Sequence, residues 1–207
     1  MKAIIDTLTK DIFDGMKEKL SYLHPKKGGY FPPEANLLFE IAKLGAKYHY
    51  FSYGEANFGS RTRRDMVLLS PEGKWICQVE AKIVNSGSCR KGAVISDLER
   101  VNDPASLKRF IENDDFRKKE EVKSYSRYGL FVGGSVCWFF SWWNSMNDSK
   151  MRDTFIQRCI TPDLQPEKYI KDLDEQLRNS MIKGTHPDVP EGEDLWLVYA
   201  LYDLSTE

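Results

Sequence analysis

The sequence lacks the features that mark membrane-spanning and disulfide-stabilised proteins. Its most apolar run, residues 130–143, is shorter than the ~20 residues that a membrane-spanning helix needs. Its four cysteines form no CxxC pair and its three histidines are widely spaced, so neither a disulfide framework nor a zinc site is indicated. The opening residues, MKAIIDTLTKDIFDG, carry charges where a secretory signal would be apolar. We therefore expect a cytoplasmic protein without a membrane partner.

The chain also lacks a net charge of either sign. Its 30 Lys and Arg residues and 31 Asp and Glu residues give a formal net charge of -1 at pH 7. This balance neither predicts nor excludes a polyanionic partner, because local patches of charge decide such binding. The hydrophobic fraction of 41% and the aromatic fraction of 13% are those of a folded protein.

The periodicity of the apolar residues predicts a chain in which helices and strands are mixed. Helices are expected at 1–22, 33–45, 93–101 and 105–122, and strands at 48–53, 65–70, 75–84 and 128–132. Residues 136–183 are expected to be mostly helical, and 195–204 to form either a strand or a short helix. This order is typical of one α/β domain, residues 1–207, with helical additions at both ends.

An acid-x-lysine string occurs four times, and its surroundings distinguish the copies. Three copies lie in a turn or in charged surroundings: Glu72/Lys74, Glu121/Lys123 and Asp148/Lys150. Only Glu80 and Lys82 lie in a predicted strand. Side-chain alternation places both on one face with Gln78, opposite an apolar face. A partly covered pocket and an edge strand with one solvated face are the two interpretations of this pattern.

Further carboxylates can approach this strand face. Asp65 opens the preceding strand, and a turn at 70–74 would fold the two strands into a hairpin that brings Asp65 towards Glu80. On the second helix, Glu34 falls in line with the apolar stripe, whereas Glu40 falls on the polar face. An exposed first-turn acid near the helix dipole is the alternative for Glu34. Two converging carboxylates could hold a hard cation such as Mg²⁺.

This arrangement resembles the PD-(D/E)xK, or restriction-endonuclease-like, nuclease superfamily. The resemblance covers about residues 33–132: a helix with an acid, a strand opening with Asp65, and a strand carrying Glu80 and Lys82. It implies an αβββαβ core with a mixed central sheet flanked by helices. Arg64 stands where the proline that gives the family its name would be, and this proline is often missing in the family.

The same resemblance implies roles for individual residues. Its catalytic set would be Asp65, Glu80, Lys82 and Glu34. The three acids would bind Mg²⁺, with Mn²⁺ as a substitute, and Lys82 would assist the attacking water. Glu40 is the less favoured replacement for Glu34, and Gln78 would line the pocket.

Basic residues flank these positions in the sequence. They are Arg61, Arg63 and Arg64 before the hairpin, and Arg90 and Lys91 after it. Such side chains suit contacts with phosphates, and ordinary solvated loop charge is the alternative. Asp97 and Arg100 on the following helix are either an i,i+3 surface pair or a pair that faces the site.

The sequence therefore predicts a Mg²⁺-dependent nuclease that hydrolyses phosphodiester bonds in DNA. A type II restriction endonuclease is the leading role, and repair or recombination nucleases are equally compatible with the core. DNA is the expected partner, and a homodimer is compatible with this class. The alternative is a non-enzymatic binding or interaction protein that retains the fold. The intact set of Asp65, Glu80 and Lys82 favours the nuclease.

Overall fold

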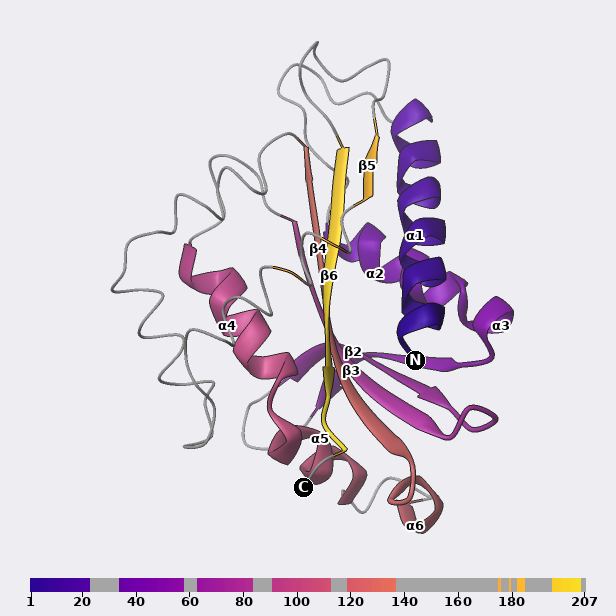
Figure 1. Ribbon diagram of the computed structural model, residues 1–207, viewed down its shortest axis with the longest axis vertical. Helices are drawn as coiled ribbons and strands as arrows, with labels where there is room; N and C mark the ends of the chain where they lie inside the picture. Colours follow the sequence, from indigo (N-terminus) through magenta and orange to yellow (C-terminus); the bar gives the residue numbers. More distant parts are fainter. Residues whose placement is uncertain are drawn as a thin grey trace.

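The computed structural model describes residues 1–22, 34–57, 63–83, 91–112, 119–136, 182–184 and 195–205, together with Glu175 and Asn179. Within these residues the chain is an α/β fold, in which helices pack against both faces of a mixed six-stranded sheet (Figure 1). The predicted α/β class and the predicted mixed central sheet are confirmed.

The sheet has the order β1-β2-β3-β4-β6-β5. Its strands are β1 (Phe51–Asn57), β2 (Arg63–Ser70), β3 (Trp75–Ile83), β4 (Ser126–Val136), β5 (Ile182–Gly184) and β6 (Leu195–Asp203). Neighbouring strands are antiparallel except β3 and β4, which run parallel. A parallel pair needs a crossover connection, and here α4, α5 and α6 lie in that crossover.

The helices form a layer on each side of the sheet (Figure 1). On one side are α1 (Lys2–Tyr22), α2 (Glu34–Lys43) and α3 (Gly45–Tyr48); on the other are α4 (Lys91–Val101) and α5 (Pro104–Glu112), followed by the short α6 (Lys119–Val122). Among the described residues, none of these helices combines the length and the apolar character needed to cross a membrane.

Alternate residues of β3 enter different apolar cores. Trp75, Cys77 and Val79 pack beneath α1 and α2, whereas Ile76 packs beneath α4 and α5. The predicted apolar face of this strand is therefore confirmed. The edge-strand alternative is wrong, because β3 lies between β2 and β4 and is buried from Trp75 to Ala81.

The first strand begins later than predicted. The aromatic content of residues 48–53 favours a strand, but residues 45–48 form α3. His49 then adopts the left-handed conformation, with φ 55° and ψ 48°, and the amide of Tyr50 donates to the Gly45 carbonyl at 3.0 Å. A left-handed residue is a common way to terminate a helix. Because of it the strand begins only at Phe51.

Other boundaries also differ from the predictions. Of the helix predicted at 105–122, the described parts are helical, as α5 and α6, and 113–118 lie outside the described residues. The predicted helical region 136–183 also lies largely outside them, and its last residues belong to strand β5 rather than to a helix. The open choice at 195–204 is decided in favour of strand β6, which pairs with β4. Pairing of this kind is non-local, so the periodicity of the run could not reveal it.

Candidate active site

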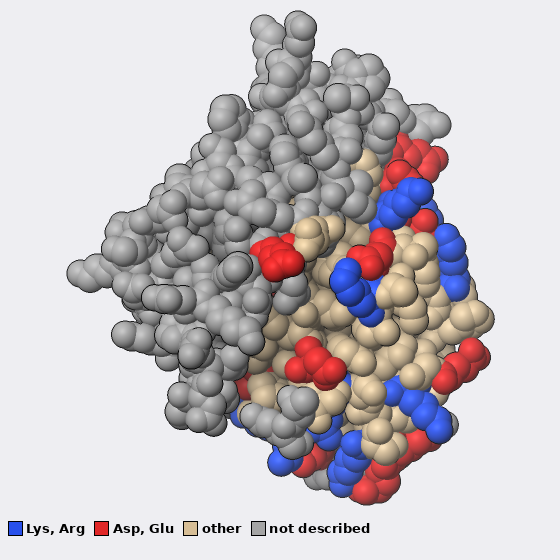
Figure 2. Space-filling view, in the orientation of Figure 1, with Lys and Arg blue, Asp and Glu red and all other residues tan. Residues whose placement is uncertain are grey.

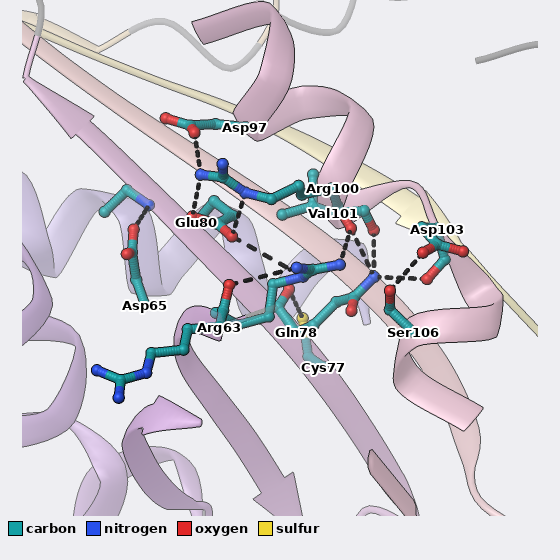
Figure 3. A network of polar contacts seen from close by, with 12 residues as sticks. Arg63, Asp65, Cys77, Gln78, Glu80, Asp97, Arg100, Val101, Asp103 and Ser106 are labelled. Carbon is teal, nitrogen blue, oxygen red and sulfur yellow. Dashed lines mark hydrogen bonds and ion pairs between the residues drawn. The ribbon is translucent and has the colours of Figure 1, made fainter. Parts of the chain in front are cut away.

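Charged side chains from four elements meet near the carboxyl end of β3. They are Asp65 from β2, Glu80 and Lys82 from β3, Glu34 from α2, and Asp97 and Arg100 from α4. The structure thus brings together the four residues predicted as a catalytic set and adds two from α4. Of the two interpretations of the Asp97 and Arg100 pair, the one that faces the site is correct (Figure 3).

The hairpin register positions Asp65. Met66 pairs with Val79, so Asp65, one residue earlier, lies at the Glu80 end of β3. One oxygen of Asp65, Oδ2, accepts a hydrogen bond from the backbone N–H of Ala81 at 2.9 Å. This bond orients the carboxylate beside the strand that carries Glu80 and Lys82.

Glu80 is buried and held by a bidentate ion pair. Arg100 donates from Nε to Oε1 at 2.9 Å and from Nη2 to Oε2 at 3.0 Å, and Arg64 Nε lies 3.8 Å from Oε1. Burial raises the pKa of Glu80 to about 7; the hydrogen bonds from Arg100 oppose the rise, and the charge of Asp65 adds to it. Arg100 is therefore the main group that stabilises the ionised form.

Lys82 links α2 to α4. Its Nζ lies 3.3 Å from Glu34 Oε2 and 3.5 Å from Asp97 Oδ2. Burial lowers the pKa of Lys82, but the charges of Asp97 and Glu34 outweigh burial, and the pKa is raised overall. Lys82 is therefore a stable cation at neutral pH, suited to donate hydrogen bonds rather than to accept a proton.

Asp97 is a buried acid that the sequence prediction left outside the catalytic set. Its Oδ1 accepts a hydrogen bond from Arg100 Nη2, while its buried Oδ2 has no hydrogen bond. Burial raises the pKa of Asp97 to about 6, against the opposing charges of Arg100 and Lys82. Asp97 lies on the same helical stripe as the buried Val94 and Val101, and an acid on such a stripe needs a partner. That position is the sequence signal that could have identified it.

Two predicted site residues instead anchor the end of α4. Gln78 Nε2 donates to the carbonyls of Arg100, Val101 and Asp103 at 3.2, 2.8 and 3.1 Å (Figure 3). Arg64 Nη2 donates to the Arg100 carbonyl at 2.9 Å. The last carbonyls of a helix have no intrahelical partner, and these side chains satisfy them.

This anchoring corrects two predictions. Gln78 is fully buried, so it does not line an open pocket. The guanidinium of Arg64 is also buried, which contradicts a phosphate contact by this residue. The physical reason is the same for both, because α4 covers the strand face that the two side chains share.

The other basic residues that were predicted to contact phosphates differ in where they lie. Arg63 is exposed and lies 3.6 Å from Glu55 on β1, so its side chain is accessible to a phosphate. Lys91 is the first residue of α4, whereas Arg61 and Arg90 lie outside the described residues. On the face drawn in Figure 2, charges of both signs are interspersed over the described part.

Glu40 does not belong to this cluster. It is buried between α1 and α2, with one oxygen 2.9 Å from Lys19 Nζ and the other 3.4 Å from Lys43 Nζ. A Cβ at Gly15 on α1 would lie 2.4 Å from Glu40 Oε2, so the two helices approach closely there. The expectation of a solvated polar face at Glu40 is wrong because α1 covers it. Glu34 is the acid of α2 that reaches Lys82.

Glu40→Ala is expected to lower the free energy of unfolding by about 2 kcal/mol, because it leaves Lys19 without its buried partner and opens a cavity. Glu34→Ala is the matched control, since Glu34 is part-exposed and makes one ion pair. Its cost should stay below about 1 kcal/mol. Urea unfolding at pH 7 measures both, and equal losses for the two variants would contradict the assignment.

The chemistry of the acidic side chains suits a hard divalent cation. Four carboxylates converge from β2, β3, α2 and α4, and Mg²⁺ prefers oxygen ligands. The buried Asp97 Oδ2 is an acceptor without a hydrogen bond. As the side chains lie, however, no three acidic, His or Cys side chains of the described residues are close enough to hold a metal ion. Instead, Arg100 contacts both Glu80 and Asp97, so a cationic side chain lies between two of the four carboxylates.

Comparison with family models, with curated proteins and with solved structures finds no match to this chain.

Proposed function

We propose that this protein is a Mg²⁺-dependent nuclease that hydrolyses phosphodiester bonds in DNA, with type II restriction as its leading role. One observation carries the proposal. Asp65, Glu80, Lys82 and Glu34, which come from three separate elements, meet at one end of β3. Contacts from α4 reach two of them, since Arg100 binds Glu80 and Asp97 pairs with Lys82, and Lys82 in turn pairs with Glu34.

The order of the elements supports the same proposal. The chain runs α2, β1, β2, β3, α4, β4, and these strands are neighbours in the sheet. This order corresponds to the αβββαβ core that the PD-(D/E)xK resemblance implies. The single turn of α3 and the helices α5 and α6 are additions within it. Asp65 and Glu80 occupy adjacent strands of this core, as that resemblance requires.

Each side chain would have a distinct part in the reaction. Asp65, Glu80 and Glu34 would hold Mg²⁺, which when bound would polarise the phosphate and lower the pKa of water. Lys82, a cation at neutral pH, would donate to the water or to a phosphate oxygen as negative charge develops. Asp97 and Glu34 hold the ammonium group of Lys82 in place before substrate arrives.

A specific observation also favours the alternative of a non-enzymatic binding protein. The bidentate pair between Arg100 and Glu80 neutralises a predicted metal ligand. A protein that retained the fold without the chemistry would be stabilised by such a pair. Metal binding and cleavage together distinguish the two functions.

The purified full chain is tested on supercoiled plasmid, linear duplex, single-stranded DNA and RNA, with Mg²⁺, with Mn²⁺ and with EDTA. We expect cleavage of DNA with either metal and none with EDTA, and discrete fragments if the role is restriction. Asp65→Asn should abolish cleavage, while Asp14→Asn, at an exposed position of α1, should not.

Cleavage that persists in EDTA or in Asp65→Asn would contradict the metal-dependent mechanism. Absence of cleavage on every substrate, together with no thermal shift from Mg²⁺ or Mn²⁺, would favour the binding protein.

A further inference from the structure

We propose that α4 supplies a built-in cation for this site: the guanidinium of Arg100 stands where a divalent cation binds, between Glu80 and Asp97. In this arrangement Asp97 is a further ligand of the metal, and Mg²⁺ binds by exchange with Arg100. The inference rests on the proposed metal-dependent function. It adds Arg100 as a competitor of the metal and Asp97 as a further ligand.

The contacts of one nitrogen atom carry the inference. Arg100 Nη2 donates to Glu80 Oε2 at 3.0 Å and also to Asp97 Oδ1 (Figure 3). Two carboxylate oxygens, one from β3 and one from α4, thus converge on a single cationic point. Carboxylates from separate elements around one point are the arrangement in which Mg²⁺ is commonly held.

The charges of the cluster agree with such an exchange. Four carboxylates face three cations, namely Lys82, Arg64 and Arg100. Without Arg100 the carboxylates would be in excess by two charges, which is the charge of one divalent cation. Repulsion among buried ionised carboxylates is costly, so a cation stabilises their ionised forms in either state.

The exposure of the side chains indicates which of them would move. The side chain of Arg100 is 43% exposed, whereas those of Glu80 and Asp97 are 1% and 3% exposed. A long, half-exposed arginine side chain can turn into solvent, while the two carboxylates are fixed by their packing. Arg64 is not the exchanging group, because its side chain is 1% exposed and bonded to the end of α4.

The second carboxylate oxygen of Asp97, Oδ2, could bind a metal. Asp97 Oδ2 is buried without a hydrogen bond, and Lys82 Nζ lies 3.5 Å away. A carboxylate oxygen has more than one lone pair, so this oxygen can bind a cation in addition to its ion pair with Lys82. The cation that replaces Arg100 would lie next to this carboxylate, which gives Asp97 a function beyond its ion pairs.

Binding of Mn²⁺ to the full chain, measured by the EPR signal of free Mn²⁺, tests the exchange. Arg100→Met removes the charge and keeps most of the side-chain stem, and we expect it to bind Mn²⁺ about tenfold tighter than the wild type or more. Arg109→Met is the matched control, since Arg109 is 50% exposed and bonded to Ser106 on α5. Asp97→Asn should weaken Mn²⁺ binding about tenfold. Unchanged or weaker binding by Arg100→Met overturns the exchange, and unchanged binding by Asp97→Asn overturns its role as a ligand.

A second measurement is made on the wild-type protein, and a variant serves only to assign one resonance. In ¹⁵N-labelled wild-type protein the Nε–H of Arg100 donates a hydrogen bond to Glu80. Its resonance is identified by its absence from the spectrum of Arg100→Lys. Titration with Mg²⁺ should shift this resonance and speed its exchange with solvent. A resonance that stays unchanged at saturating Mg²⁺ overturns the exchange.

The two proposals fail in distinguishable ways. If the wild type cleaves DNA with Mg²⁺ but Arg100→Met binds Mn²⁺ no tighter, the exchange is overturned and the nuclease stands. If Arg100→Met binds Mn²⁺ tightly but no variant cleaves, the exchange stands and the nuclease fails.

Discussion

Gly129→Ala is expected to lower the free energy of unfolding by about 3 kcal/mol or more. Gly129 lies on β4, and a Cβ built there would be 1.8 Å from the carbonyl oxygen of Val101 and 2.8 Å from its carbonyl carbon. The clashing atoms belong to the backbone of Val101, so no change of side-chain rotamer removes the clash. Either α4 leaves the sheet or β4 distorts.

The same substitution should disturb the site. Gly129 pairs with Gln78 on β3, and Gln78 Nε2 donates to the carbonyl of Val101 at 2.8 Å. Together the two residues define where the end of α4 rests on the sheet. Asp97 and Arg100 lie within the last two turns of that helix. A shift of α4 would therefore separate them from Glu80, and metal binding should weaken along with stability.

Urea unfolding of the wild type and of Gly129→Ala measures the loss. Gly54→Ala is a matched control, because Gly54 also lies in a strand, β1, and no atom is within 4 Å of a Cβ built there. Its effect should stay within about 0.5 kcal/mol. A Gly129→Ala protein within about 1 kcal/mol of the wild type would contradict the close approach of α4.

Lys82→Met is expected to slow Mg²⁺-dependent cleavage by about a thousandfold. Methionine fills a similar volume but cannot donate to the water or to the phosphate. The ammonium is held by Glu34 and Asp97 at 3.3 and 3.5 Å, so its position is set before substrate binds. Removal of a preorganised charge acts mainly on the rate of the chemical step, because that charge matters most in the transition state.

Single-turnover cleavage of supercoiled plasmid at saturating Mg²⁺ measures this loss, and a thermal melt confirms that the variant is folded. Lys123→Met is the control, since Lys123 carries the same acid-x-lysine string but makes an exposed pair with Glu120. Its rate should equal that of the wild type. Removing one preorganised donor typically slows a reaction by much more than about threefold. A Lys82→Met rate within about threefold of the wild-type rate would therefore show that Lys82 has no catalytic role.

Local patterns were sufficient to predict the hairpin and the elements around it. Strand alternation separated Glu80 and Lys82 from the apolar residues of β3, and the turn at 70–74 placed Asp65 at their end. These inferences succeeded because the pleat of a strand and a tight turn depend on residues close in the sequence. The mixed sheet was implied by the resemblance to the PD-(D/E)xK superfamily, not by these patterns.

Predictions failed where a distant element covers a face. The helical pattern of α2 places Glu40 on its polar side, yet α1 buries it with Lys19. Arg64 was expected at the surface, but α4 covers it. Charge alone does not reveal burial, because a buried charge is stable only when tertiary contacts supply its partners.

Side-chain periodicity and turn residues were enough to predict the α/β class and the hairpin, and to select Glu80 and Lys82 among four similar strings. Those features depend on side-chain periodicity and turn residues within a few positions of one another. The packing of the helices was needed to show that Glu34 rather than Glu40 reaches Lys82, that Gln78 and Arg64 anchor α4, and that Arg100 holds Glu80 and Asp97. Those contacts join residues far apart in the chain, and their partners are set by how the helices pack on the sheet.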